Sequence, residues 1–217
     1  MPIRAVFFDV GETLISEQRV WTDWARWLGV RPITFLAQLG AVIERREHHL
    51  RVFDAFREPG TFDVEKERLA LLAAGRGVDI DASDLYPDAI SCLDALKQQG
   101  LVVGVAGNQP PDVSEAIFKA CGIELDVIAS SAAWGVEKPS PEFFDRVARE
   151  AGVAPAEIAY VGDRVDNDVI PANAAGMVSV FIRRGPWGYI HSTWPEAEQA
   201  AIRIDSLDEL PGRLVSS

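Results

Sequence analysis

Short apolar runs separated by helical patterns are the feature that most constrains how this chain can fold. Residues 5–8 form one such run, and residues 101–106, 125–129, 158–161 and 178–182 repeat it further along the chain. These runs are mostly apolar rather than strictly alternating, which is typical of strands buried on both faces of a parallel sheet. The chain is therefore expected to contain five buried strands.

Helical patterns lie between the later runs and produce a β-α alternation. They cover residues 89–98, 112–121, 141–151 and 166–175, and a short closing helix is expected at 205–214. Alternating strands and helices predict a parallel sheet with helices on both faces. Right-handed crossovers then bring the carboxyl ends of all strands to one edge. We therefore predict an α/β fold with a Rossmann-like core.

The segment between the first strand and residue 86 has a different pattern. Trp21, Trp24 and Leu28 recur at helical spacing, and similar patterns follow at 33–43 and 62–72. The simplest interpretation is an all-helical insert between the first strand and the rest of the sheet.

The domain boundaries follow from this change of pattern. We predict a core domain made of residues 1–15 and 86–217, with a helical domain of residues 16–85 inserted into it. Asp88 lies directly before the helix that resumes the core and is a plausible N-cap.

Composition and charge narrow the functional classes. The chain has 217 residues, of which 48% are hydrophobic and 25% charged, as in an ordinary globular protein. Its formal net charge is -12. An acidic chain is a poor candidate for nucleic-acid binding, whereas excess carboxylate is compatible with a divalent metal.

Cysteine usage and the absence of long apolar runs indicate a cytoplasmic protein. Cys92 and Cys121 lie in apolar helical patterns and form no C-x-x-C pair, so we expect buried thiols in a reducing compartment. The first residues lack a secretory signal pattern, and no apolar run approaches the ~20 residues that a membrane span needs. We expect no membrane association.

Polar residues follow the predicted strands at the points where the strands end. An aspartate in such a place can simply close a strand as a turn residue, and a lone lysine before a helix is usually on the surface. Several together at one sheet edge are better explained by a ligand site, because ligands bind at that edge in open α/β sheets. The residues are Asp9, Gly107, Asn108, Lys138, Asp163 and Asp168.

Their chemistry is that of a magnesium-dependent phosphoryl site. Mg²⁺ takes one or two carboxylates together with water and substrate phosphate, which Asp9 and Asp163 can supply, with Asp168 behind them or bound through water. Lys138 is a point charge for phosphate. Asn108 can bind phosphate oxygens, and a carboxylate can attack phosphorus to form an aspartyl-phosphate.

The motifs resemble those of the haloacid dehalogenase (HAD) superfamily, in its subgroup with a helical cap, over almost the whole chain. The family's Asp-x-Asp-Gly-Thr motif corresponds to residues 9–13, and its Ser/Thr-Asn motif to Gly107 and Asn108. Its Lys-Pro motif corresponds to Lys138 and the following proline, and its Gly-Asp-x4-Asp motif to residues 162–168.

This resemblance implies roles for individual residues. Asp9 would be the nucleophile, and Lys138 the partner of both the phosphate and the nucleophile. Mg²⁺ would be bound by Asp9, Asp163 and the backbone carbonyl of Gly11. The inserted helical domain would be a cap that helps to select the substrate.

Two positions depart from the family pattern. The second aspartate of the first motif, the family's general acid and base, is Gly11 here, and the hydroxyl of the second motif is lost at Gly107. A positioned proton donor is typically worth ~10²–10⁴ in rate, so hydrolysis of ordinary sugar phosphates would suffer. Glu12 either substitutes for the missing acid or points to solvent in the turn.

Two further clusters have less specific patterns. Arg45, His48 and His49 would share one face if their segment were helical, where they could contact an anionic substrate or form a solvated, salt-bridged surface. Trp187 and Trp194 form an aromatic loop after the last strong strand, for which we expect core or interface packing rather than a substrate wall.

We predict a hydrolase: a Mg²⁺-dependent phosphatase of a small phosphorylated metabolite, weakened by the glycine at position 11, acting as a monomer or homodimer. One alternative is a catalytically impaired binding protein of the same fold. Another is a dehalogenase-like hydrolase, against which the acids Asp163 and Asp168 argue because they serve a metal. No G-x-G-x-x-G follows the first strand, so a nicotinamide enzyme is not expected.

Overall fold

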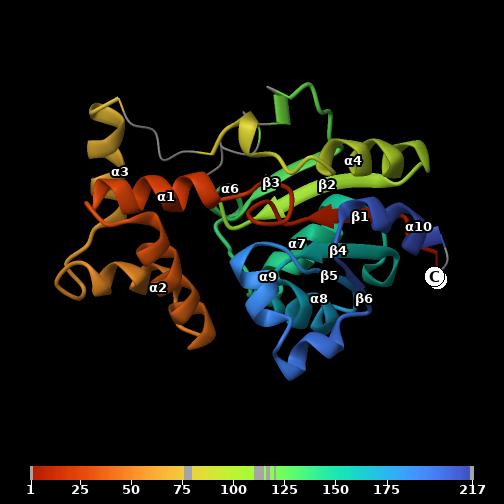
Figure 1. The fold of residues 1–217 in the computed structure, drawn as a ribbon. Helices are drawn as coiled ribbons and strands as arrows, with labels where there is room; N and C mark the ends of the chain where they lie inside the picture. The colour runs from red at the N-terminus through yellow and green to blue at the C-terminus, as the bar shows by residue number, and fades with distance from the viewer. Residues whose placement is uncertain (1, 76–79, 110–114, 116–117, 120, 216–217) are drawn as a thin grey trace. The chain divides into compact units, whose positions relative to one another are not determined.

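A six-stranded parallel sheet forms the centre of the protein (Figure 1). The computed structural model describes residues 2–75, 80–109, 115, 118–119 and 121–215. The strand order is β3-β2-β1-β4-β5-β6. The strands are β1 (Ala5–Phe8), β2 (Val102–Gly107), β3 (Val127–Ser130), β4 (Ile158–Gly162), β5 (Val178–Ile182) and β6 (Ile202–Ile204). The predicted α/β class with a Rossmann-like parallel sheet is confirmed.

The strand order places a topological switch point between β1 and β4. From β1 the chain proceeds outward to β2 and β3, and it then crosses back to β4 on the other side of β1. Right-handed crossovers in opposite directions put their helices on opposite faces of the sheet. The carboxyl ends of β1 and β4 therefore flank the crevice in which ligands of such folds bind.

Helices cover both faces of this sheet. On one face, α7 (Pro141–Ala151) and α8 (Ile170–Ala174) pack against Phe7 and Tyr160. On the other, α4 (Ala89–Gln98) contacts β2 and α10 (Leu210–Val215). The core also holds α6 (Ser131–Trp134), α9 (Gly185–His191), the π-turn η4 (Val165–Val169) and the 3₁₀ turns η3 (Pro155–Glu157), η5 (Pro195–Gln199) and η6 (Leu207–Glu209).

The chain divides into two compact units. The first consists of residues 1–16 and 85–217, and the second of residues 17–84. In its described part the second unit is helical: α1 (Gln18–Trp27), α2 (Pro32–Glu44), η1 (His49–Ala55), α3 (Val64–Ala73) and η2 (Ala82–Asp84). Its core is aromatic, since Trp24 and Phe35 both pack on Phe53, with ring centroids 5.4 Å and 5.7 Å away.

Several local expectations need correction. The strand β6 was missed because it has only three residues with Arg203 at its centre. The helix expected at 166–175 is a π-turn followed by α8, and the closing segment is a 3₁₀ turn followed by α10. The aromatic loop is a mistaken prediction as well, because Trp187 lies in the helix α9. Most of the helix expected at 112–121 lies outside the described residues.

Two predicted side-chain roles also differ. Asp88 stands at the N-cap position of α4 but forms no capping hydrogen bond, because its carboxylate instead binds the Arg184 guanidinium and the Ser206 hydroxyl. Cys92 is buried, whereas Cys121 is half-buried. Trp187 and Trp194 are both buried, as expected for core packing.

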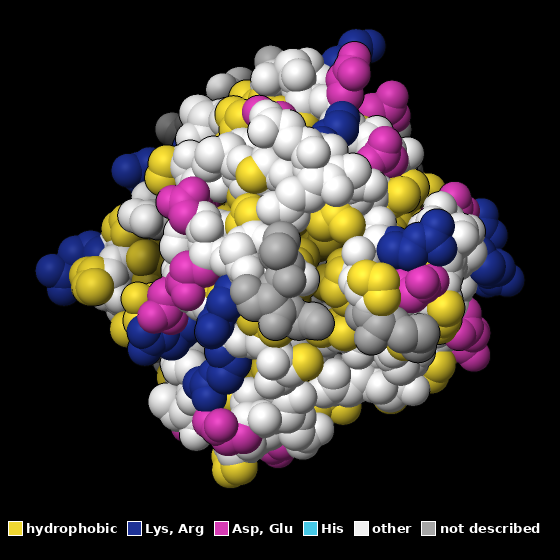
Figure 2. Space-filling model, turned by 90° about the vertical axis from the view of Figure 1, so that its right-hand side faces the viewer, with side chains coloured by type: hydrophobic (Ala, Val, Ile, Leu, Met, Phe, Trp, Pro, Cys, Tyr) yellow, Lys and Arg dark blue, Asp and Glu magenta, His cyan; other side chains and the backbone are white. Residues whose placement is uncertain are grey.

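Charged side chains of both signs are interspersed on the face of the molecule shown in Figure 2. None of the helices in the described ranges is long and apolar enough to span a bilayer.

Candidate active site

Lys138 joins two carboxylates at the carboxyl edge of the sheet. The backbone N–H of Asp9 donates to the Val161 carbonyl at 2.8 Å, which extends the β1–β4 pairing and holds Asp9 at the switch point. Lys138 Nζ lies 2.8 Å from Asp9 Oδ1 and 2.6 Å from Asp168 Oδ1. The lysine is 3% exposed, so both ion pairs are shielded from solvent.

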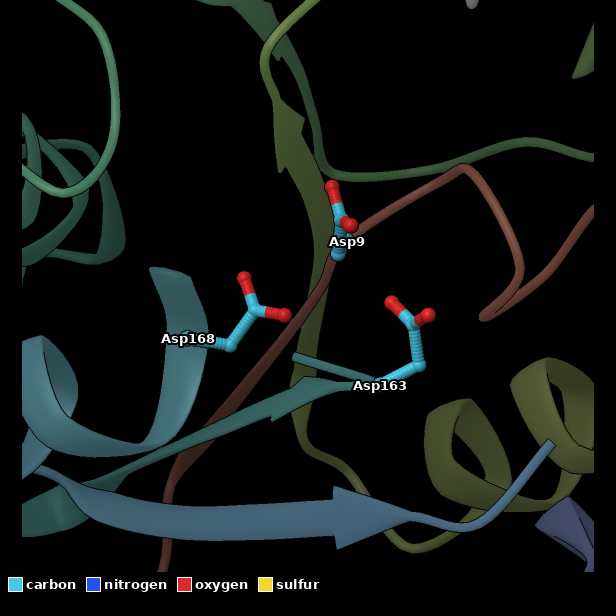
Figure 3. Close-up of side chains that lie close together, drawn as sticks. All are labelled: Asp9, Asp163 and Asp168. Carbon is cyan, nitrogen blue, oxygen red and sulfur yellow. The ribbon is translucent and has the colours of Figure 1, made fainter. Parts of the chain in front are cut away.

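Three carboxylates point into one space at this edge (Figure 3). Asp9, Asp163 and Asp168 each offer an oxygen within 4.8 Å of the others. Asp163 is 1% exposed, and its Oδ2 has no hydrogen-bond partner among the described residues. A buried carboxylate oxygen without a donor is costly unless a cation lies beside it. The donor set is therefore chemically suited to Mg²⁺, which prefers carboxylate oxygen.

The spacing between Asp163 and Asp168 is set by the turn that joins them. Asp168 folds back over the end of β4, where a Cβ on Gly162 would stand 2.2 Å from Asp168 Oδ2. Only glycine leaves room for this approach. The backbone N–H of Arg164 donates to the same Oδ2 at 3.0 Å, which fixes the carboxylate that faces Lys138.

Electrostatics differ among these groups. Burial alone would lower the pKa of Lys138, but the charges of Asp168 and Asp9 outweigh it and hold the pKa well above its usual value. Burial, together with the neighbouring charges of Asp168, Asp9 and Glu12, raises the pKa of Asp163 well above its usual value. Burial also raises the pKa of Asp168 to about 6, although Lys138 opposes the shift.

Asn108 holds the backbone of the lysine segment. Its Oδ1 accepts a hydrogen bond from the Lys138 N–H at 2.8 Å, and its Nδ2 donates to the Lys138 carbonyl at 2.9 Å. An amide nitrogen has two N–H donors, so this pairing leaves one that can serve an anion. The structure thus gives Asn108 a positioning contact, while its role as a phosphate ligand stays a prediction.

Gly107 lies against the predicted nucleophile. A Cβ at this position would stand 2.7 Å from Asp9 Oδ1. The Asp9 carboxylate thus occupies the space that a side chain of residue 107 would need. A serine or threonine at position 107, as in the family's second motif, would therefore require Asp9 to move.

Glu12 is buried in the turn after Asp9. It is 3% exposed, so the alternative that it points to solvent is wrong. Its φ of 51° lies in the left-handed region, which costs a non-glycine residue on the order of 1–3 kcal/mol. Its Oε2 accepts a hydrogen bond from the Tyr86 hydroxyl at 2.6 Å, and a Cβ on Gly185 would lie 2.3 Å from the same oxygen. Gly11, beside it, is half-buried.

Residues that the sequence analysis missed support this turn. The Arg184 guanidinium lies 4.3 Å from the centre of the Tyr86 ring and donates to the Thr13 carbonyl at 3.1 Å. The same guanidinium pairs with Asp88. On the other side of the site, the Tyr160 ring lies 5.5 Å from Lys138 Nζ. The only sequence signal was that Arg184 follows the strand β5.

Arg45, His48 and His49 do not share a helix face. The helix α2 ends at Glu44, and Arg46 turns the chain with a φ of 57°. The His48 and His49 rings stack with centroids 4.4 Å apart. Arg45 donates to Glu47 at 3.2 Å. The single-face prediction is wrong because the helix stops before these residues, and their role in substrate selection stays a prediction.

The structure thus brings Asp9, Asn108, Lys138, Asp163 and Asp168 together at the sheet edge where their sequence positions placed them. Their chemical roles stay predictions.

Comparisons with known proteins agree with this fold. The sequence pattern of the haloacid dehalogenase-like hydrolases matches residues 3–176. A glyceraldehyde 3-phosphate phosphatase of Methanopyrus kandleri is 33% identical over 201 residues, which are 85% of this chain and 86% of that protein.

Two solved structures share the fold. One is a predicted phosphoglycolate phosphatase from Haemophilus somnus, with a TM-score of 0.71, 19% identity and coverage of 100% of this chain and 99% of that chain. The other is the L-2-haloacid dehalogenase of Xanthobacter autotrophicus, with a TM-score of 0.66, 22% identity and coverage of 99% of both chains.

The family match and the phosphatase relative identify a hydrolase of the α/β class, and its clustered carboxylates lie at the switch point of the sheet. The chain belongs to the haloacid dehalogenase-like hydrolase family.

Proposed function

We propose that the protein is a Mg²⁺-dependent phosphatase that hydrolyses a small phosphorylated metabolite through an aspartyl-phosphate on Asp9. The observation that carries this proposal is the buried Asp163, whose Oδ2 has no donor within the described residues and whose carboxylate lies beside those of Asp9 and Asp168. Relatives named as phosphatases of glyceraldehyde 3-phosphate, phosphoserine and phosphoglycolate support the substrate class.

In this mechanism Lys138 is paired with the nucleophile Asp9 before the substrate arrives. Lys138 stabilises the negative charge of Asp9 at 2.8 Å and presents positive charge to an incoming phosphate. A carboxylate oxygen of Asp9 forms a bond to phosphorus while the bond from phosphorus to the ester oxygen breaks, and the ester oxygen takes up a proton. Water then attacks the aspartyl-phosphate, which releases inorganic phosphate and restores Asp9.

The residues that would hold Mg²⁺ are Asp9, Asp163 and the carbonyl of Gly11, with Asp168 beside them. The bound ion supplies charge neutralisation for the phosphoryl oxygens. Asp168 is fixed by Lys138 Nζ and by the Arg164 N–H, so its chief contribution is to orient the lysine.

The proton for the leaving oxygen is the weak point of this site. Gly11 has no side chain to provide it, and the nearest carboxyl in the turn is that of Glu12. We propose that the enzyme is slow with alkyl phosphates unless Glu12 delivers this proton. The helical unit of residues 17–84 would act as the cap, with Arg45, His48 and His49 as candidate substrate contacts.

A panel of small phosphate esters tests the function. Phosphate release is measured with and without Mg²⁺ on glyceraldehyde 3-phosphate, phosphoglycolate, phosphoserine and nitrophenyl phosphate, with Asp9→Asn as the inactive control. We expect release that needs both Mg²⁺ and Asp9.

Two outcomes would replace the proposal. Binding of Mg²⁺ and a phosphate analogue without turnover of any ester would favour the catalytically impaired binding protein. Release of halide from a 2-haloacid without added metal, and dependent on Asp9, would favour the dehalogenase-like hydrolase.

A further inference from the structure

A buried histidine contacts the turn that carries the acidic residues. His191 ends the helix α9, is 1% exposed, and accepts a hydrogen bond at Nδ1 from the backbone N–H of Val165 at 3.0 Å. Its ring stacks on Trp194 with centroids 3.7 Å apart, which fixes the ring plane. The contact joins two segments that are 26 residues apart in sequence.

The Val165 N–H is a donor that its own turn cannot satisfy. Val165 is the first residue of the π-turn η4, and the first N–H groups of any helical segment lack a partner within it. Side chains such as serine or aspartate usually cap these groups, but Arg164 stands at the N-cap position and forms no side-chain cap bond. His191 supplies the acceptor from a distant part of the chain.

This turn determines where two site carboxylates lie. Asp163 lies two residues before it, and Asp168 lies within it. Its outer side is held by the Arg164 guanidinium, which donates to both oxygens of Asp166 at 3.1 Å and 2.8 Å and lies 5.8 Å from the centre of the Trp187 ring. The His191 bond holds the backbone of the turn at Val165.

We propose that His191 is a positioning residue of the active site, which fixes the turn of residues 163–168 so that Asp163 and Asp168 keep their places beside Asp9. The histidine acts through the backbone of Val165 and touches neither substrate nor metal. Support of this kind behind metal ligands is typically worth 10–100-fold in metal affinity or activity. The inference rests on the proposed Mg²⁺-dependent function only for its affinity and activity readouts.

Three substitutions separate the hydrogen bond from the packing of the ring. His191→Asn places an amide oxygen near the position of Nδ1 and keeps an acceptor for Val165. His191→Gln moves the acceptor one bond further out, and His191→Leu keeps apolar bulk without an acceptor. Ser179→Ala is the matched control, because the buried Ser179 hydroxyl accepts the Ala201 N–H at 3.2 Å near the amino end of β5, away from the site.

The experiment measures three quantities for each full-length variant. These are the exchange rate of the Val165 amide proton without metal, the Mg²⁺ dissociation constant by calorimetry, and kcat and KM for nitrophenyl phosphate. We expect His191→Leu to speed Val165 exchange and to raise the Mg²⁺ dissociation constant by about 10-fold or more. In His191→Asn both the Val165 exchange rate and the Mg²⁺ dissociation constant should stay close to those of the wild type. Ser179→Ala should change neither, although it lowers the free energy of unfolding.

Several results would overturn the proposal. One is unchanged Val165 exchange and Mg²⁺ affinity in His191→Leu. Another is an equal defect in His191→Asn and His191→Leu, which would show that packing alone matters. If the leucine variant does not fold, the asparagine and glutamine variants decide. Equal Mg²⁺ affinities of these two would contradict the proposal, because only asparagine keeps the acceptor in place. If the wild type does not bind Mg²⁺, the proposed metal-dependent function is wrong. The exchange rate of the Val165 amide would still show whether His191 holds the turn.

Discussion

The hydroxyl of Tyr86 donates a hydrogen bond to Glu12 Oε2 at 2.6 Å across 74 residues of sequence. Burial, together with the charge of Glu12, raises the pKa of Tyr86, so the phenol stays protonated and remains a donor. One carboxyl oxygen of Glu12 is thereby held in a defined place. Substitutions of Glu12 and of Tyr86 can therefore test whether Glu12 gives a proton to the leaving oxygen.

Glu12→Gln should separate substrates by their leaving groups. The nitrophenolate of a nitrophenyl phosphate leaves without a proton, whereas the alkoxide of an alkyl phosphate needs one in the transition state. We expect turnover of the alkyl ester to fall by about 10²-fold and that of the nitrophenyl ester by no more than about threefold. The glutamine carbonyl can still accept from Tyr86, so the turn should persist.

Tyr86→Phe is the control for this prediction, because it removes the phenol and keeps the carboxyl. It should retain the ratio of the two rates within about threefold, since the proton donor itself remains. Equal losses on both esters in Glu12→Gln would show that Glu12 supports the fold of the turn and transfers no proton.

Gly11→Asp should raise activity toward alkyl phosphates. The left-handed residue of this turn is Glu12, with a φ of 51°, so the strain falls on that neighbour. An aspartate at position 11 would restore the side chain that the family uses as general acid. We expect at least about a 10-fold gain on the alkyl ester and a smaller change on the nitrophenyl ester. Gly11→Asn, which has the same shape without a proton to give, should show no such gain.

Gly107→Ser should not restore the missing phosphate contact. The added Cβ would meet Asp9 Oδ1 at 2.7 Å, so the nucleophile must shift away from Lys138 before the hydroxyl can act. We expect kcat to fall by about 10-fold, because small displacements of reacting groups are costly in rate. Gly107→Ala serves as its comparison and should show a similar loss. A gain in the serine variant alone would mean that the hydroxyl outweighs the crowding.

Much of the site was predictable because local pattern and topology carry it. Asp9, Lys138 and Asp163 each follow a strand or precede a helix, and parallel strands deliver such positions to one edge. Tyr86 and His191 could not be found in this way, since they reach the site through folded contacts with distant turns. The burial of Glu12 was also hidden, because it depends on Gly185 lying against it.

Asp163→Asn should stabilise the metal-free protein at pH 8 while it removes Mg²⁺ binding. Burial raises the pKa of Asp163 in the folded state, and that of Asp168 to about 6, whereas an unfolded aspartate titrates at about 3.9. The folded protein thus holds these protons more tightly than the unfolded chain does. The free energy of unfolding therefore falls as pH rises from about 4 through about 6, where Asp168 loses its proton. Asp163 adds a further fall as pH rises through its own raised pKa.

An amide in place of the Asp163 carboxylate does not titrate. The variant therefore lacks the part of the pH-dependent fall in unfolding free energy that comes from Asp163. In chelator at pH 8 we expect it to exceed the wild type by about 0.5–2 kcal/mol in urea unfolding, with the gap closing toward pH 4. Saturating Mg²⁺ should reverse the order, because only the wild type gains binding energy. Asp145→Asn, at an exposed position on α7, should leave both comparisons unchanged. A variant less stable than the wild type in chelator at pH 8 would mean that Asp163 has a stabilising partner without metal.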